Sequence, residues 1–463
     1  MASREGTAAP LVAALAESRL GQGASRGWNV LREGLATASA ASQLAPHAQR
    51  LALGSVCLLF VASPWVGTGL NAAMVLLAAA WVVVWRLTAA PKPGVTWLDA
   101  AVLGFAAAHL MATGFSPYLA ASLKGLAKML VYWLAYVAFR HVLADRMAVR
   151  TVLLALLGSA ALESAYGVYQ WVVGVEPLAN WEDPEALNPL TRVYGSLMNP
   201  NLLAGYLLPL FPLAVATAFT QRGTLRQVGL AAAVLAPICV FFTYSRGAYL
   251  GLAASLAVLG TLGLSLAWPA LSRRRGLVVG LGAAGVVGLA GVVWRVLANQ
   301  ALLDRLASIF TLRGHSSNSF RVNVWHGVVQ MVQDNWLFGI GIGNTAFRKM
   351  YSLYMVSGYE ALGAYNIFLE VLAEMGVVGL AAFLGLLATL VLTAWRTFHA
   401  GDQEARWLAA GILAGLAGIL VMGLVDTVFY RPAVQLQFWW LMALAVALSQ
   451  APRGGTTEER TSP

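Results

Sequence analysis

The sequence predicts an all-α polytopic membrane protein with about twelve transmembrane helices. Of its 463 residues, 59% are hydrophobic and only 11% are charged, whereas about a quarter of a soluble domain is charged. The mean hydropathy of +0.70 points the same way. Apolar runs of about 20 residues, the length that a helix needs to cross the hydrocarbon layer, recur along the chain. These observations exclude a soluble enzyme with a large core.

The apolar runs predict the individual spans. They cover residues 51–69, 70–86, 97–115, 124–142, 151–174, 200–220, 227–244, 247–269, 276–297, 363–396, 407–425 and 433–450. The run at 363–396 is longer than one span requires, so we expect a broken or tilted helix there. The chain then divides into an N-terminal arm (1–50), spans 1–9 (51–297), a large loop (298–362), spans 10–12 (363–450) and a tail (451–463).

Basic residues predict the orientation of these spans. Most of the 30 basic residues lie in the arm, the tail and every second loop, as Arg140, Arg146 and Arg150 do. By the positive-inside rule, both termini are expected in the cytoplasm. The net charge of +10 is thereby explained by topology, so we predict no nucleic-acid partner.

Two loops on the predicted external side are substantial, at residues 175–199 and 298–362. A loop of about 65 residues is far longer than an ordinary connector and often carries function. Within it we expect a helix at 320–333 and a tight Gly-rich turn at 339–344. The turn "GIGIGN" lacks the surrounding strand–turn–helix unit of a nucleotide site. Since no metal motif occurs and both cysteines lie in apolar runs, we predict no metal and no cofactor.

Eleven basic residues gather on the predicted external side, against the topology rule: Lys124, Lys128, Arg192, Arg246, Arg295, Arg305, Arg313, Arg321, Arg348, Lys349 and Arg431. They are explained by snorkelling at the interface, by ion pairs such as Arg431 with Asp426, or by an anion site. Guanidinium groups bind carboxylate, phosphate or bicarbonate through two parallel hydrogen bonds. Arg246, in a very short turn, and Arg321, on the loop helix, favour the anion site.

Carboxylates inside two predicted spans are unusual. Glu163 is central in 151–174, where a lone ionised carboxylate costs several kcal/mol. It is either a hydrogen-bonded structural group or part of a proton or ion relay. In "YNIFLEVLAEMG", Asn366, Glu370 and Glu374 recur every four residues on one helix face. Glu374 is interpreted as a buried structural group, and the other two as residues that line a cavity or orient an arginine.

Four motifs follow one another: "GSLMNPNLLAGYL" (195–207), "TYSRGAYLGL" (243–252), "SFRVNVWHGVVQMVQDNWLFGIGIGN" (319–344) and "YNIFLEVLAEMGVVGL" (365–380). Together they resemble the O-antigen ligase and polymerase superfamily of bacterial inner-membrane proteins. The segments "GLAKMLVYWL" and "LVDTVFYRPAVQLQFWW" extend the similarity to a cyanobacterial branch assigned to bicarbonate (inorganic carbon) transport. The resemblance implies a polytopic protein of the bacterial inner (plasma) membrane.

The resemblance also implies roles for single residues. External arginines of the ligases hold the diphosphate of a polyprenyl-linked glycan, and Arg246 and Arg321 match such positions. The ligases carry a histidine, assigned as the general base, before the Asn of their "N-x-x-L" motif; Tyr365 stands there in this chain. With an ordinary pKa of about 10, tyrosine is a poor base at neutral pH. His315 is an alternative base, so the catalytic residue stays unknown.

Three functions remain open. The first is a transporter, or transport-associated protein, for bicarbonate, with an external anion site formed by Arg192, Arg246, Arg321, Arg431, Asn366 and Glu370. The second is a glycosyltransferase that moves a glycan from a polyprenyl-diphosphate donor, and this alternative would make the chain an enzyme. The third is a non-catalytic membrane scaffold. The expected partners are a small anion or a lipid-linked glycan, together with membrane lipid.

Overall fold

The described part of the chain is a bundle of long helices. A computed structural model describes residues 33–34, 37, 43–88, 94–176, 178, 192–271 and 316–450, and no β-strand occurs in these ranges. In chain order the elements are η1 (Ala45–His47), α3 (Ala48–Ala62), α4 (Thr68–Thr88), α5 (Trp97–Gly114), α6 (Leu119–Val142), α7 (Arg146–Val173), η2 (Gly195–Leu197), α8 (Pro200–Leu207), α9 (Leu210–Thr220), α10 (Gly223–Phe242), α11 (Arg246–Leu271), α14 (Ser316–Asp334), α15 (Asn344–Tyr351), α16 (Ile367–Ala400), α17 (Gln403–Gly423), η3 (Val428–Tyr430) and α18 (Pro432–Gln450).

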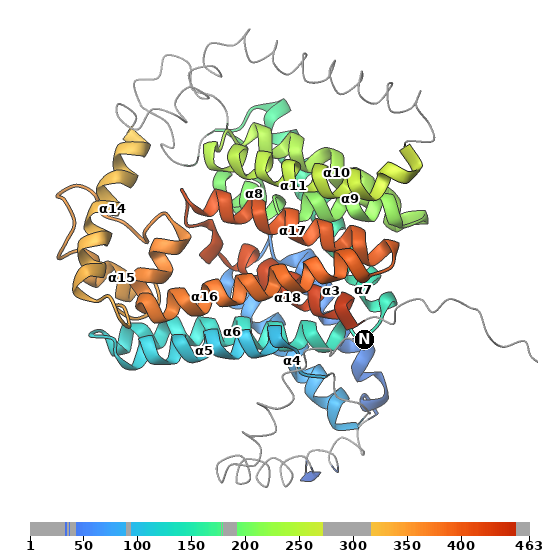
Figure 1. The fold of residues 1–463 in the computed structure, drawn as a ribbon, viewed down its shortest axis with the longest axis horizontal. Helices are drawn as coiled ribbons and strands as arrows, with labels where there is room; N and C mark the ends of the chain where they lie inside the picture. Colours follow the sequence, from blue (N-terminus) through green and yellow to red (C-terminus); the bar gives the residue numbers. More distant parts are fainter. Residues whose placement is uncertain are drawn as a thin grey trace, which may run out of the picture.

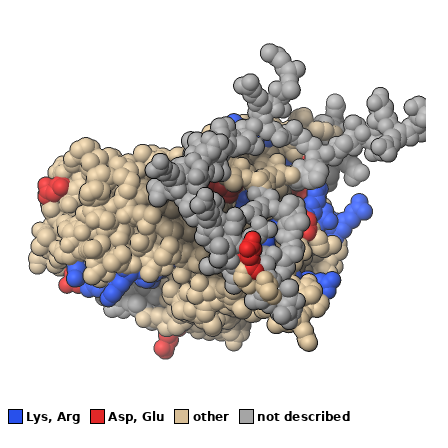
Figure 2. Space-filling view, turned by 90° about the horizontal axis from the view of Figure 1, so that it is seen from below, with Lys and Arg blue, Asp and Glu red and all other residues tan. Residues whose placement is uncertain are grey.

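The predicted class, an all-α polytopic membrane protein, is confirmed. Ten candidate spans in the described ranges are long and apolar enough to cross a membrane. The predicted span 124–142 corresponds to α6, which has 24 residues and is not among these ten. The predicted span 276–297 lies outside the described residues. Figure 2 shows a surface on which charged side chains are sparse, as expected of a protein surrounded by lipid.

The boundary predicted between the first two spans lies too far along the chain. The first helix ends at Ala62 and the second begins at Thr68, because a short turn containing Pro64 separates them. Asn71 stabilises this turn: its side-chain amide donates to the backbone oxygens of Ser63 (3.3 Å) and Val66 (3.2 Å). Buried carbonyls that a helix would have satisfied thus find a side-chain partner.

Three spans form the centre of the bundle. In the spans made by α8–α9, α17 and α18, between 78% and 83% of the residues are buried inside the protein. In every other candidate span of the described ranges this share is at most 50%. The first of these is interrupted at Pro209, since proline has no N–H to donate. Trp439 and Trp440 of α18 are fully buried in this core. The remaining spans surround it and expose their apolar side chains outward.

Residues 316–362 of the large loop fold into a small helical layer across one end of the bundle (Figure 1). Its helix α14 and its Gly-rich segment (residues 339–343) confirm the predicted elements. A second cluster of buried side chains, including Val324 and Phe347, forms its own core. Trp325 donates from its indole N–H to the backbone oxygen of Ala364 (2.9 Å), in the segment just before α16. We call this end of the bundle the α14 end.

Helix α16 is broken, as its length predicted. Gly376 has φ 62° and ψ −166°, which ends the regular helix in the middle of the span. The Gly-rich segment lies against the break: Ile340 N–H donates to the Ala373 carbonyl and Gly341 N–H to the Glu374 carbonyl, both at 3.0 Å. Backbone groups freed by the break are therefore satisfied by the loop. The glycines permit a close approach of two backbones, and a nucleotide site is not needed to explain them.

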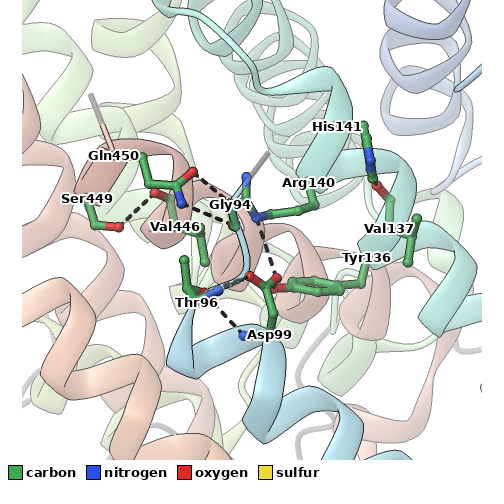
Figure 3. A network of polar contacts seen from close by, with 10 residues as sticks. All are labelled: Gly94, Thr96, Asp99, Tyr136, Val137, Arg140, His141, Val446, Ser449 and Gln450. Carbon is green, nitrogen blue, oxygen red and sulfur yellow. Dashed lines mark hydrogen bonds and ion pairs between the residues drawn. The ribbon is translucent and has the colours of Figure 1, made fainter. Parts of the chain in front are cut away.

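An ion pair and several hydrogen bonds join three helices at the opposite end of the bundle (Figure 3). The buried Arg140 guanidinium of α6 lies 3.5 Å from the Asp99 carboxylate of α5. It also donates to the Gly94 carbonyl (3.0 Å) and to the side-chain oxygen of Gln450 on α18 (2.9 Å). The Tyr136 hydroxyl donates a hydrogen bond to the Asp99 carboxylate (2.6 Å). One of the arginines predicted to set topology therefore also holds helix ends together.

We expect Arg140→Gln to lower the free energy of unfolding by about 3 kcal/mol, because it leaves Asp99 without its buried ionic partner. Arg146→Gln is the matched control: Arg146 pairs with Asp402, but these side chains are 43% and 31% exposed. An exposed pair contributes less than about 1 kcal/mol. Denaturant titration of the full chain in detergent measures both. Equal losses for the two variants would contradict the assignment of Arg140 as the stronger contact.

Candidate functional site

A cavity of about 300 Å³ opens at the α14 end. Its walls come from α5, α6 and α14, from the N-terminal parts of α4, α8, α16 and α18, from residues 342–344, from Leu362 and Tyr365, and from the turn between α17 and α18. Charged and polar side chains from elements far apart in sequence meet there: Lys128, Asn201, Arg321, Asn344, Tyr365, Glu370, Glu374, Asp426 and Arg431. A cavity of this size, with a few converging polar groups, is typical of a ligand site.

A chain of polar contacts holds Arg321 of α14 at this cavity. Arg321 forms an ion pair with the buried Asp426 (3.8 Å). The same carboxylate oxygen accepts from the side-chain amide of Asn201 (2.7 Å), whose oxygen in turn accepts from Arg192 (2.9 Å). The other oxygen of Asp426 accepts from Thr427 N–H (2.7 Å). Because Asp426 has fixed partners on both oxygens, it positions the Arg321 guanidinium rather than acting as a mobile acid.

The "NPN" motif explains why Asn201 points at this carboxylate. Asn199 caps α8, since its side-chain oxygen accepts from the N–H groups of Asn201 (2.9 Å) and Leu202 (3.1 Å). Pro200 occupies the first helical position, where no N–H is needed. The left-handed Met198 (φ 57°) turns the chain just before the cap. Asn201 is consequently placed on the first turn of α8, beside Asp426.

Tyr365 lines the cavity just before α16. Its backbone is left-handed (φ 50°), and its ring packs edge-on against Phe320 at 5.4 Å between ring centres. Burial and the nearby charge of Asp426 raise the pKa of Tyr365 above its ordinary value. The phenol therefore stays protonated at neutral pH, and a proton-accepting role for Tyr365 is disfavoured further.

The two carboxylates of α16 are buried and line the same cavity. Glu370 accepts from Ala364 N–H, and Gly363 leaves room for it, because a Cβ there would lie 2.6 Å from both carboxylate oxygens. Glu374 accepts from Gly343 N–H at 2.8 Å. Neither carboxylate forms an ion pair with a residue in the described ranges. Glu374 thus has the buried, hydrogen-bonded position that was predicted, and Glu370 faces the predicted cavity.

Four predicted site residues lie away from the cavity lining. Arg192 is buried behind Asn201 and donates from Nε to the Thr243 carbonyl (2.9 Å). Arg246 begins α11, beyond the turn at Thr243. Asn366 caps α16 through Phe368 N–H and Leu369 N–H, and its amide donates to the Leu424 carbonyl (3.0 Å). Arg192 and Asn366 thus support neighbouring backbone, and anion binding by Arg246 stays a prediction.

Glu163 is the fourth. It is fully buried on α7 and accepts hydrogen bonds from the N–H and the hydroxyl of Ser196 in η2. Gln170, two turns further along α7, accepts from Gly195 N–H at 2.8 Å in the same turn. These contacts favour the structural interpretation of Glu163 over a proton or ion relay.

Asp426, Asn201 and Lys128 line the cavity but were not among the predicted binding residues. Asp426 was considered only as an ion-pair partner of Arg431, whereas the structure pairs it with Arg321. The sequence signal that could have identified Asp426 was a carboxylate in the short turn "VDTVFYR" between two apolar runs.

Four predicted residues lie outside the described ranges: Arg295, Arg305, Arg313 and the alternative base His315. Among the residues that are described, no cluster of three or more His, Cys, Asp or Glu side chains could hold a metal ion.

The fold and the site define a polytopic helical membrane protein with a charged cavity at one end of its bundle. Residues 231–384 match the family described as O-antigen ligase. The chain is also 22% identical over 241 residues to the teichuronic acid biosynthesis protein TuaE of Bacillus subtilis (strain 168). The aligned region covers 49% of this chain and 45% of that relative. The match thus spans less than half the length of that relative. The first similarity relates this segment of the chain to the O-antigen ligase family, and the second is to a relative whose name assigns that protein to teichuronic acid biosynthesis.

Proposed function

We propose that the protein transfers a glycan from a polyprenyl-diphosphate donor to an acceptor hydroxyl. The single observation that carries this proposal is the cavity that Arg321 and Arg431 line together with the buried carboxylate Glu370. Cations suit a diphosphate leaving group, and a carboxylate suits the proton of an attacking hydroxyl. Arg321, Tyr365 and Glu370 lie inside the segment that matches the O-antigen ligase family.

The size of the cavity supports a large substrate. A water molecule occupies about 30 Å³ in the liquid, so about 300 Å³ is far more than bicarbonate, with four heavy atoms, needs. A diphosphate with its first sugar makes better use of this room. Bicarbonate transport, the function predicted first, is the competing hypothesis for the same cations.

In the proposed reaction, the acceptor hydroxyl oxygen attacks the anomeric carbon of the donor sugar. The bond between that carbon and the phosphate oxygen breaks, and the lipid diphosphate leaves with the electron pair. Arg321, held by Asp426, and Arg431 neutralise the charge that develops on the diphosphate. Glu370 takes the proton of the hydroxyl, because Ala364 N–H fixes one of its oxygens while the side chain lines the cavity.

Localisation follows from the donor. We infer that the protein lies in the bacterial inner membrane with both termini in the cytoplasm, as the basic loops predict. The α14 end then faces away from the cytoplasm. Enzymes of this kind use lipid-linked glycans on that outer side of the membrane. Cysteine labelling at position 349, an exposed lysine of α15, with an impermeant reagent in intact cells tests this orientation.

Reconstitution separates the two functions. The full chain in liposomes is supplied either with a polyprenyl-diphosphate-linked oligosaccharide and a glycan acceptor, or with labelled bicarbonate under a proton or sodium gradient. Glycan transfer without bicarbonate uptake is the expected result. Bicarbonate uptake above empty liposomes, with no transfer, would replace the proposed function by transport.

The proton acceptor is tested by exchanging Glu370 and Tyr365 separately. We expect Glu370→Gln to lower the transfer rate by about 10²- to 10⁴-fold, the usual contribution of a general base. Tyr365→Phe keeps the ring and removes only the hydroxyl, which stays protonated at neutral pH. Transfer should therefore persist with an unchanged pH profile. Initial rates measured between about pH 6 and 9, around neutrality, give both results. Loss of transfer in Tyr365→Phe, with Glu370→Gln active, would assign the role to Tyr365.

A further inference from the structure

Three polar side chains in the lining of the cavity take no part in the proposed reaction. They are His109 of α5, Tyr132 of α6 and Gln435 of α18. Only 4%, 9% and 3% of their surfaces, respectively, are exposed. A buried polar group is costly unless it is hydrogen-bonded, so each of the three side chains requires a partner.

His109 and Tyr132 lie deeper in the bundle than the Gly-rich segment. Ser116, just after α5, donates to a carbonyl of that segment (2.7 Å). Gly125 of α6 also contacts the segment, because a Cβ there would lie 2.3 Å from one of its carbonyl oxygens. His109 precedes Ser116 by seven residues and Tyr132 follows Gly125 by seven, which is about 10 Å along each helix axis. The His109 ring packs edge-on against Trp133 at 5.7 Å between ring centres, so the two helices meet at this level.

Gln435 lies at the same level. Helices α6 and α18 pack against each other, and the rings of Tyr136 on α6 and Trp439 on α18 are in contact, with centres 6.0 Å apart. Tyr132 and Gln435 are each four residues earlier, hence one turn nearer the α14 end on two helices that both begin there. The three polar side chains consequently gather from three helices at one end of the cavity, which we call its deep end.

Each of the three side chains has hydrogen-bonding capacity left over. His109 Nδ1 lies 2.8 Å from the Phe105 carbonyl, which can only accept, so Nδ1 carries the proton and Nε2 of the neutral ring carries a lone pair. The side-chain oxygen of Gln435 accepts from the Trp439 indole N–H (2.8 Å), so the amide N–H groups of Gln435 are available to donate. The Tyr132 hydroxyl can donate and accept. In the described part of the chain, none of these remaining groups has a hydrogen-bond partner.

The walls of the deep end are apolar. Phe105, Met129, Phe438 and Trp439 line the cavity beside the three polar side chains, and none of these residues carries a charge. Aromatic walls with a few converging polar groups are typical of a site for a small organic ligand. An alkyl chain would leave all three polar side chains without partners, and an ionised group would be buried without a counter-charge; both are costly. The deep end therefore suits an uncharged ligand that is rich in hydroxyl groups.

We propose that the deep end binds an uncharged sugar ring of the glycan. Sugar hydroxyls both donate and accept, so they satisfy the lone pair of His109, the amide N–H groups of Gln435 and the hydroxyl of Tyr132 together. The apolar C–H face of the ring packs against the aromatic walls. A uronic acid is rejected here, because its ionised carboxylate would lose water without gaining a cation. The inference rests on the proposed function and names the class of sugar that its site takes.

Direct binding of free sugars tests this inference without the lipid-linked donor. The full chain is placed in nanodiscs prepared without glycoside detergent, and saturation-transfer NMR is recorded with methyl glucoside, methyl galactoside, methyl mannoside and the methyl glycosides of glucuronic and galacturonic acid. Tyr132→Phe removes only a hydroxyl, and His109→Phe removes the lone pair of Nε2 while it keeps a ring. Tyr136→Phe is the matched control, because it removes a hydroxyl one turn further along α6, outside the cavity lining.

We expect at least one of the neutral glycosides to bind the wild-type chain, and neither uronic acid glycoside to do so. Tyr132→Phe and His109→Phe should each raise the dissociation constant of that neutral glycoside about fivefold, the usual loss for one neutral hydrogen bond. Tyr136→Phe should leave the dissociation constant unchanged.

The inference would be overturned if no neutral glycoside bound, or if both variants bound it as tightly as the wild-type chain. Uronic acid glycosides that bound as tightly as the neutral ones would overturn the assignment to an uncharged sugar. A chain that bound a neutral glycoside through these side chains but transferred no glycan in liposomes would contradict the proposed function instead, and would leave the deep end as a sugar site.

Discussion

Arg321→Gln is expected to lower the rate of glycan transfer by about 10²- to 10³-fold, the usual cost of removing one charge-stabilising donor from a reaction site. The physical reason is its place in the cavity. The ion pair with Asp426 and the contacts behind it, through Asn201 to Arg192, orient the guanidinium before substrate arrives. A preorganised cation needs no rearrangement when the leaving diphosphate gains charge. Initial rates with the lipid-linked oligosaccharide measure this loss.

Two further variants make the result specific. Arg348→Gln removes an exposed arginine of the same loop layer that does not line the cavity, so its transfer rate should equal that of the wild-type chain. Arg321→Lys retains a positive charge but not the planar fork, and an intermediate rate is expected. If Arg321→Gln transferred glycan as fast as Arg348→Gln, the cavity would not be the site of transfer.

Gly376→Ala is expected to destabilise the protein by at least about 3 kcal/mol. The backbone of Gly376 lies in a region that only glycine occupies readily, and a Cβ there would lie 2.2 Å from the Leu337 carbonyl oxygen. The Trp336–Phe338 backbone would have to move. Two hydrogen bonds would be disturbed, from Val377 N–H to Trp336 (2.8 Å) and from Val378 N–H to Leu337 (3.4 Å). Unfolding of the purified chain in detergent measures the loss.

Gly385→Ala is the matched control, because Gly385 is on the same helix, is exposed, and has nothing within 4 Å of an added Cβ. Alanine is the better helix former at an ordinary helical position, so this variant should be as stable as the wild-type chain or more so. Comparable loss of stability in both variants would mean that α16 tolerates no change anywhere. A stable Gly376→Ala would show that the break in α16 does not depend on glycine.

Much of the fold could be predicted because membrane burial leaves a strong one-dimensional signal. A span needs about 20 apolar residues, and that requirement is visible in any window of the sequence. The excess length of 363–396 even predicted the break in α16. The boundary near Pro64 was missed, since the turn there is held by Asn71, whose side chain acts on residues five and eight positions earlier.

The candidate site was predictable only in part. Arg321, Arg431, Tyr365 and Glu370 were predicted and do line one cavity. Arg192 and Asn366 have the expected residue types, but their side chains are engaged with neighbouring backbone and with Asn201. Arginines that bind a ligand and arginines that hold a turn look alike in a sequence. Only the partner on the other side of the contact distinguishes them.

The sequence by itself determined that this protein lies in a membrane, where its helices run and which family its motifs resemble. The length of an apolar run and a local motif are both properties of contiguous residues. The tertiary structure alone decided which charges meet. Asp426 reaches Asn201, which is 225 residues away in sequence, and Lys128 reaches the cavity because Gly125 fits against Ile342. Such pairs depend on how helices pack, and packing is set by complementary shapes that no single stretch of the chain encodes.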